Sequence, residues 1–258
     1  MNKKKIQKEH IKKLDIIDQF NKFYYDKNDP KVSDQQYDEL KKEILSLEKK
    51  YKFLKSNKSP SKVVGFKPSK NFKKGFHRVP MLSLANAFSE EDLVNFEKRV
   101  LNFISENKNF KINYSVEPKI DGISASLTYK NGKFIAGLSR GDGKEGEDIT
   151  ANLSTIEDIP KEILSKDFPE DIDIRGEVFI QNSDFEILKE KFANPRNAAS
   201  GSLRQKNYED TKKIPLKFIA YTFGYEKGLN LENQFEYLKK LSKWGFKTNP
   251  LNKIITGV

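Results

Sequence analysis

The first part of the chain carries apolar side chains at helical spacing. The apolar positions are Tyr37, Leu40, Ile44, Leu47, Tyr51 and Leu54, spaced three or four residues apart. That spacing places them on one face of a helix, and Ser33 with Gln36 has the spacing of a capping box at its start. An earlier helix is predicted by Ile6, Leu14, Ile17 and the aromatic run at residues 20–24. We therefore expect a small helical hairpin domain over residues 1–58, followed by the linker-like stretch KSNKSPSK.

From about residue 110 the apolar pattern changes to a period of two. Ile123, Ala125, Leu127 and Tyr129 share one face of a predicted strand, and Ser124, Ser126 and Thr128 share the other. The sequence YKNGK supplies an Asn-Gly hairpin turn. Further strands are predicted at FIAGLSRG, DIDIRGEVFI and IPLKFIAYTFGY, and helices at SEEDLVNFEKRVLNFI, SDFEILKEKF and LENQFEYLKKLSKWGF. Because strands and helices do not alternate one for one, we expect an α+β fold with antiparallel sheets and flanking helices, not a doubly wound sheet.

Composition excludes several classes of chemistry. The chain has 258 residues and no cysteine, which rules out disulfides, cysteine zinc sites and thiol catalysis within it. The start, MNKKKIQKEHIKK, has no apolar signal region, and no stretch approaches 18 apolar residues. We expect a cytoplasmic protein.

The net charge of +11 is unevenly distributed. Residues 1–58 carry 16 Lys/Arg and 10 Asp/Glu, residues 59–78 carry 6 and none, and residues 79–258 carry 26 and 27. The basic excess is therefore N-terminal. It favours a polyanionic partner such as nucleic acid, although a generally lysine-rich composition, with 42 Lys against 6 Arg, is an equally good explanation.

The stretch VEPKIDGISASLTY places Lys119 just before an Asp-Gly pair at the start of a strand. Such a lysine can be a solvated charge that protects a sheet edge, and Asp-Gly can be only a turn. The surrounding motifs change that balance. They are MLSLANAF (81–88), SRGDGKEGEDIT (139–150), IRGEVF (174–179) and FANPRNAASGSLRQ (192–205). Together these motifs resemble the NAD-dependent DNA ligases of bacteria over nearly the whole chain.

The resemblance implies a chemistry for Lys119. Its amine would attack the α-phosphate of NAD, retain AMP covalently and release nicotinamide mononucleotide (NMN), and AMP would later pass to the 5′-phosphate of a DNA nick. A free lysine titrates near about 10.4, so such an amine needs neighbours or burial to become a nucleophile. Mg²⁺ is expected to offset phosphate charge, with no residue assigned as a dedicated metal ligand. Nicked double-stranded DNA is the expected partner of a monomer that serves DNA replication and repair.

The resemblance also assigns the site residues. The catalytic set is Lys119, Asp121, Glu177, Arg196 and Arg204; the adenosine side adds Ser83, Leu84, Glu117, Gly122, Arg140 and Tyr221; the NMN side is Tyr24, Tyr25, Asp34, Tyr37 and Asp38. Arginine's planar fork suits phosphate contacts, which favours Arg196 and Arg204 in a lysine-rich chain. Glu177 can accept ribose hydroxyls or hold a metal.

Structural alternatives remain for several of these residues. Glu117 can be a surface acid, Tyr221 can be a core aromatic, and Tyr37 lies on the apolar helix face. Asp34 lies in a first helical turn, where the helix dipole favours an acid. His77 is expected to be structural.

The chain departs from the family's pattern in two places. Tyr24-Tyr25 stands where the family usually has Tyr-His, which removes a group that titrates near neutrality. The chain also ends at Val258, before two strand segments that carry nucleotide-contacting lysines and before the family's DNA-binding domains. We therefore expect residues 59–258 to be a C-terminally incomplete nucleotidyltransferase (adenylation) domain, with NAD binding, weak or absent self-adenylation and no efficient nick sealing.

Two other functions compete with this enzyme. One is a truncated, non-catalytic module that binds NAD or nucleic acid. The other is an ATP-dependent nucleotidyltransferase, which the helical hairpin carrying SDQQYD disfavours.

Overall fold

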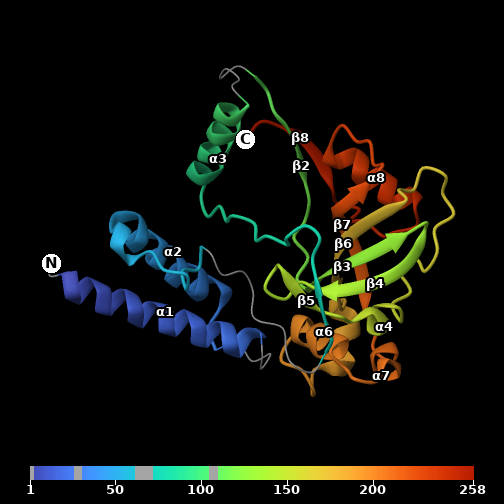
Figure 1. The fold of residues 1–258 in the computed structure, drawn as a ribbon, viewed down its shortest axis with the longest axis horizontal. Helices are drawn as coiled ribbons and strands as arrows, with labels where there is room; N and C mark the ends of the chain where they lie inside the picture. Colours follow the sequence, from blue (N-terminus) through green and yellow to red (C-terminus); the bar gives the residue numbers. More distant parts are fainter. Residues whose placement is uncertain (1–2, 26–30, 62–71, 105–109) are drawn as a thin grey trace.

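The N-terminal part of the molecule is a pair of packed helices (Figure 1). The computed structural model describes residues 3–25, 31–61, 72–104 and 110–258. Helices α1 (Lys3–Tyr25) and α2 (Asp34–Lys50) bury Leu14, Ile17 and Ile44 between them. The predicted capping box is present: the Ser33 hydroxyl accepts from the Gln36 amide, and the Gln36 side chain accepts from the Ser33 amide.

The predicted apolar face continues beyond the end of α2. Tyr51 is the C-cap residue, and Leu54 lies in the short 3-10 helix η1 (Lys52–Leu54), where it is buried. In the predicted linker, Ser59 is also buried, and its hydroxyl donates to Glu48 over 2.6 Å. His10 of α1 contacts the other oxygen of Glu48 at 2.9 Å. These bonds attach the segment after α2 to the helical hairpin.

The rest of the chain is built on antiparallel sheets. The strands are β1 (Lys74–Phe76), β2 (Asn113–Val116), β3 (Ile123–Lys130), β4 (Lys133–Ser139), β5 (Glu145–Glu147), β6 (Asp171–Phe179), β7 (Lys217–Lys227) and β8 (Lys253–Thr256). Four of them form a sheet in the order β4-β3-β6-β7, and the pairs β1-β5 and β2-β8 are separate (Figure 1). The predicted turn joins β3 to β4, with positive φ angles at Asn131 and Gly132.

Helices flank these sheets, so the predicted α+β class is confirmed. They are α3 (Glu90–Phe103), α4 (Thr150–Leu153), α5 (Asn182–Phe185), η2 (Glu186–Leu188), α6 (Pro195–Leu203), α7 (Tyr208–Lys212) and α8 (Gln234–Lys243). Helix α8 packs against β7, and α6 contacts β6 and β3.

The prediction of one continuous helix over residues 183–192 is wrong. The segment forms only the four-residue α5 followed by η2, and Gln181 gives no side-chain cap. Phe185 and Leu188 are its buried apolar side chains. Because short helices depend on tertiary packing, these two buried side chains support only one α-helical turn followed by one 3-10 turn.

The central strand β6 separates an apolar face from a polar one. Ile172, Ile174 and Val178 join the main core, whereas the alternate positions Asp173, Arg175 and Glu177 are charged and buried on the opposite face. On that face the Ser124 hydroxyl of β3 donates to Glu177 over 2.8 Å, and the Thr128 hydroxyl donates to Asp173 over 2.7 Å. We call this side of the sheet the polar face, and it supports the site described below.

No helix within the described part of the chain is both long enough and apolar enough to cross a membrane.

Candidate active site

The segment between β2 and β3 places Lys119 at the edge of the polar face. The Lys119 side chain is exposed, and Gly122 a little further on is buried against β6. A Cβ at Gly122 would lie 2.3 Å from the Val178 carbonyl oxygen and 2.9 Å from Cγ of Glu177. Only glycine lets the main chain pass this close to β6, and the approach brings the lysine segment to Glu177.

Glu177 is the buried acid of this region. Burial raises the pKa of its carboxyl group, and the Ser124 hydrogen bond together with the charges of Arg196, Lys119 and Arg140 opposes that rise. Those three cations come from different elements of the fold. The predicted residues Lys119, Arg140, Glu177 and Arg196 are therefore brought together electrostatically.

Helix α6 carries the two predicted phosphate-binding arginines at its ends. Asn194 caps the helix by accepting from the Asn197 amide at 2.7 Å, which fixes Arg196 in the first turn. Arg196 Nη1 donates to Asp121 Oδ1 over 2.8 Å, beside the lysine. At the other end, Arg204 Nε donates over 3.0 Å to Glu147, whose side chain is fully buried.

The predicted adenosine side is organised around Tyr221. This residue lies at a register shift, because Arg175 pairs with Thr222 whereas Gly176 pairs with Ala220. Such a bulge redirects a side chain within a strand. Burial, followed by the Glu177 charge, raises the pKa of Tyr221 to about 12, so its hydroxyl stays protonated near neutral pH.

Gln234 connects two of the predicted adenosine-side residues. Its Nε2 donates to Glu117 Oε1 over 3.0 Å and to the Tyr221 carbonyl over 2.7 Å. Ser115 also donates to Glu117 Oε1, over 3.3 Å. Glu117 is therefore oriented by neighbours, unlike a free surface acid.

Ser83 and Leu84 lie on an irregular segment that crosses the polar face, which we call the strap (residues 77–84). The His77 Nε2 atom is 3.1 Å from the carbonyl oxygens of both Ser139 and Arg140. At its far end, Arg140 Nη2 donates to Ser83 Oγ over 3.2 Å. Ser83 and Leu84 are exposed, and the serine is joined to the cluster around Glu177 through Arg140.

The predicted NMN side is only partly described. Tyr37 packs against the helical-hairpin core and its hydroxyl donates to Asn21 over 2.9 Å. Asp38 Oδ2 accepts from Asn86 Nδ2, just beyond the strap, over 2.9 Å. The side chains of Tyr24, Tyr25 and Asp34 lie outside the described part of the structure.

Sequence reasoning missed four residues of this region. Ser124, Glu147 and Gln234 bond to predicted site residues, and the charge of Arg175 acts on Tyr221. Alternation could have identified Ser124 and Arg175, because polar residues recur at every second position of β3 and β6. The contact between Gln234 and Glu117 spans 117 positions, and no local pattern indicates it.

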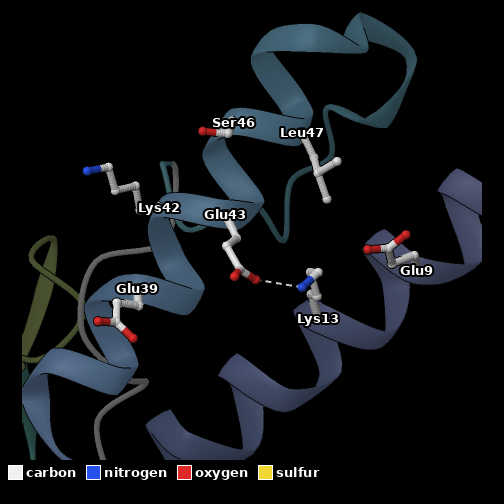
Figure 2. A pocket seen from close by; sticks show the side chains of 7 residues that line it. All are labelled: Glu9, Lys13, Glu39, Lys42, Glu43, Ser46 and Leu47. Carbon is white, nitrogen blue, oxygen red and sulfur yellow. Dashed lines mark hydrogen bonds and ion pairs between the residues drawn. The ribbon is translucent and has the colours of Figure 1, made fainter.

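A separate hollow lies on the helical hairpin (Figure 2). Its lining residues are Glu9, Lys13, Glu39, Lys42, Glu43, Ser46 and Leu47. Lys13 and Glu43 form an ion pair of 2.6 Å across it, and none of the lining residues is a predicted site residue. Within residues 3–25, 31–61, 72–104 and 110–258, no three histidine or acidic side chains are grouped as metal ligands.

Two family models match the chain. One, described as the NAD-dependent DNA ligase adenylation domain, covers residues 69–258, and the other, described as the DNA ligase-like N-terminal NAD+-binding domain, covers residues 3–65. A DNA ligase of Pelagibacter ubique (strain HTCC1062) is 66% identical over 258 residues, which is 100% of this chain and 38% of the relative. The DNA ligases of Parvibaculum lavamentivorans and Xanthobacter autotrophicus are 44% and 45% identical, over 91% and 88% of this chain. The chain spans 38%, 34% and 33% of the length of these three relatives.

Proposed function

The chain belongs to the NAD-dependent DNA ligase family and contains its adenylation domain, and from this we propose that Lys119 is the residue that becomes adenylated. Its amine attacks the α-phosphorus of NAD, so that an N–P bond forms while the bond from that phosphorus to the bridging oxygen breaks. NMN leaves with the oxygen, and the amine loses a proton. The product is a lysyl-AMP.

The gathering of Lys119, Arg140, Arg196 and Glu177 supports this assignment. An attack at phosphorus needs cations placed where negative charge develops, and the arginines come from separate elements of the fold. Arg196 is held by Asp121, and Arg204 by Glu147, so both guanidinium groups are already oriented.

The residues next to the cluster suit adenosine. Tyr221, with its protonated hydroxyl, lies near Glu177 and offers an aromatic face, while Glu117 is oriented by Gln234. We assign Ser83 and Leu84 on the strap to the same half of NAD, and Tyr37 and Asp38 on α2 to the NMN half.

Magnesium fits this donor set if one carboxylate is combined with substrate phosphate oxygens and water. Mg²⁺ usually binds one or two carboxylates plus phosphates and retains several waters, and Glu177 is the carboxylate we propose for it, since the described residues hold no larger acidic cluster. When bound, the ion would neutralise phosphate charge.

The relatives' name points to DNA as the acceptor of AMP. We propose that the adenylate passes to the 5′-phosphate of a nicked duplex. The support within the chain is the basic excess of its first 78 residues, because cations that contact DNA phosphates contribute most of non-specific DNA affinity.

Radiolabelled NAD tests the proposal. With Mg²⁺ present, we expect weak covalent labelling of the chain by adenylate-labelled NAD and none by ATP labelled in its α-phosphate. Lys119→Ala and Lys119→Arg should both remain unlabelled, since a guanidinium does not lose its proton in a protein. Lys130→Ala, an exposed lysine at the far end of β3, is the matched control and should label normally.

Two results would contradict the assignment. A labelled Lys119→Ala protein would place the adenylate elsewhere. NAD binding without any label, measured by calorimetry on the same sample, would favour a non-catalytic NAD-binding module.

A further inference from the structure

The strap is fastened to the molecule along its length. The His77 amide donates to the Lys144 carbonyl over 2.9 Å, and the Met81 amide donates to the Gly143 carbonyl over 2.8 Å. Between them, Arg78 donates to Asp171 and Asp173 and stacks on Tyr225, with its guanidinium carbon 4.2 Å from the ring centroid. The strap therefore follows a defined path although it has no regular secondary structure.

Arg175 of β6 binds the middle of the strap. Its side chain is buried on the polar face of β6, and its two terminal nitrogens donate to consecutive main-chain carbonyls. Nη1 donates to Pro80 over 3.3 Å, and Nη2 donates to Val79. A planar guanidinium fixes two acceptors in direction as well as in distance.

The surroundings of Arg175 differ from those of an ordinary buried ion pair. The neighbouring carboxylate of Asp173 accepts hydrogen bonds from Arg78 and Thr128. Burial lowers the pKa of Arg175, which reflects the cost of keeping this cation away from water. Among the described residues, both terminal nitrogens of this buried arginine bond to main-chain carbonyls, which suits it to hold that main chain in place.

Gly224 provides the space for this guanidinium. A Cβ at that position would lie 2.8 Å from Nη2 and 2.9 Å from Cζ of Arg175. The strand β7 thus leaves room for the arginine at a position where any side chain would displace it.

Ser83 follows Pro80 by only three residues, a span of roughly 10 Å when extended. Its hydroxyl accepts from Arg140, whose charge acts on Glu177. A shift of the carbonyls at Val79 and Pro80 would therefore be transmitted to Ser83 and Leu84.

We propose that Arg175 is a positioning residue for nucleotide binding, which fixes the strap by its main chain and so places Ser83 and Leu84 against adenosine. This inference rests on the proposed function, in which the polar face binds the adenylate.

The test compares AMP binding to the whole chain and three variants by calorimetry. Arg175→Gln, which loses the fork, should weaken AMP binding about tenfold. Arg175→Lys should restore part of that loss because it keeps the charge and one donor group. Gly224→Ala retains the arginine but displaces its guanidinium group, so we expect a smaller loss of AMP affinity in the same direction.

A double-mutant cycle separates positioning from simple destabilisation. If Arg175 acts through Ser83, Arg175→Gln should cost little further affinity in a Ser83→Ala background, so the two effects are not additive. The control is Leu241→Ala, a core change in α8, which should lower the melting temperature while AMP affinity stays normal.

Amide hydrogen exchange, measured without nucleotide, reports directly on how firmly the strap is held. Arg175→Gln should accelerate exchange at His77 and Met81, whose amides join the strap to the carbonyls of Lys144 and Gly143. Unchanged exchange, or fully additive effects in the cycle, would overturn the proposal while AMP still binds the unaltered chain. Failure of the unaltered chain to bind AMP would overturn the proposed function as well.

Discussion

At the scale of single residues, Gly122 and His77 have roles that depend on their residue type. Gly122 matters for what it lacks, because the main chain at this position touches the carbonyl of Val178. His77 matters for its titration, because its ring is half-buried and its Nε2 atom lies close to two carbonyl oxygens.

We predict that Gly122→Ala destabilises the adenylation domain by about 1–3 kcal/mol, because the added carbon would lie 2.3 Å from a main-chain oxygen that cannot rotate away. Lysine labelling by NAD should fall with it. Gly201→Ala is the comparator, since its added carbon meets only the edge of the Phe192 ring, at 2.9 Å. Equal urea midpoints for the two variants would contradict the steric argument.

His77 should give the protein a pH-dependent stability. Burial lowers its pKa from 6.5, an effect larger than the opposing hydrogen bonds to Arg140 and Ser139. The folded state then favours the neutral ring, so this stabilisation is complete above about 6.5 and is lost as pH falls through the lower folded value. His77→Gln keeps a donor but cannot titrate, so its melting temperature should fall less than that of the unaltered chain between pH 7.5 and 5.5. Parallel pH curves would show that His77 does not contribute.

Motif spacing could predict Lys119, Glu177 and Arg196 as site candidates because each stands in a long, ordered local pattern. It could not predict Gln234, since its partners come from remote parts of the chain and meet only after folding. Arg175 is intermediate. The alternation with Asp173 and Glu177 indicates that it lies on the charged face of its strand. Its bonds to main-chain carbonyls could not be predicted, because they depend on where the strap lies in the folded chain.

At the scale of elements, caps and alternation were reliable guides. The helix α2 begins where Ser33 and Gln36 predicted, and β3 and β4 turn at Asn131 and Gly132. The prediction over residues 183–192 failed because apolar spacing alone does not measure how many side chains the fold will cover.

The α2 cap offers a test at this scale. Ser33→Ala removes one bond of the capping box and should cost about 1 kcal/mol. Ser46→Ala is the matched control, an exposed serine inside the same helix (Figure 2), where alanine should be neutral or stabilising. Unfolding of the helical hairpin in urea, followed by circular dichroism, distinguishes the two. A loss of equal size in both variants would argue against the cap.

At the scale of the whole molecule, the helical hairpin and the adenylation domain meet through the chain that leaves the strap. Asn86 donates to Asp38 of α2, and Lys42 lies 5.7 Å from the ring centroid of Phe88. Asp38, one of the residues we assign to NMN, is therefore engaged by the adenylation domain.

This contact should compete with NMN for Asp38. Asn86→Ala removes the donor, so we predict that NMN affinity rises up to about fivefold, the value of one exposed hydrogen bond. Asp38→Ala should instead lose NMN binding measured by the same calorimetry. A fall in NMN affinity in Asn86→Ala would mean that the asparagine orients Asp38 for the ligand and does not compete with it.

Only two residues lie between Ser83 and Asn86 in the sequence, so the chain fixes how far apart their two contacts can be. Ser83 bonds to Arg140 on the polar face, and Asn86 bonds to Asp38 on α2. A single inserted residue would add roughly 3.5 Å of chain and would break one of these two hydrogen bonds. For anyone who recombines related proteins, the natural unit of exchange is then not the helical hairpin alone. A donor's α2 should be transferred together with its own residues 84–88, and chimaeras cut between these segments should lose the matching of the two halves of the dinucleotide.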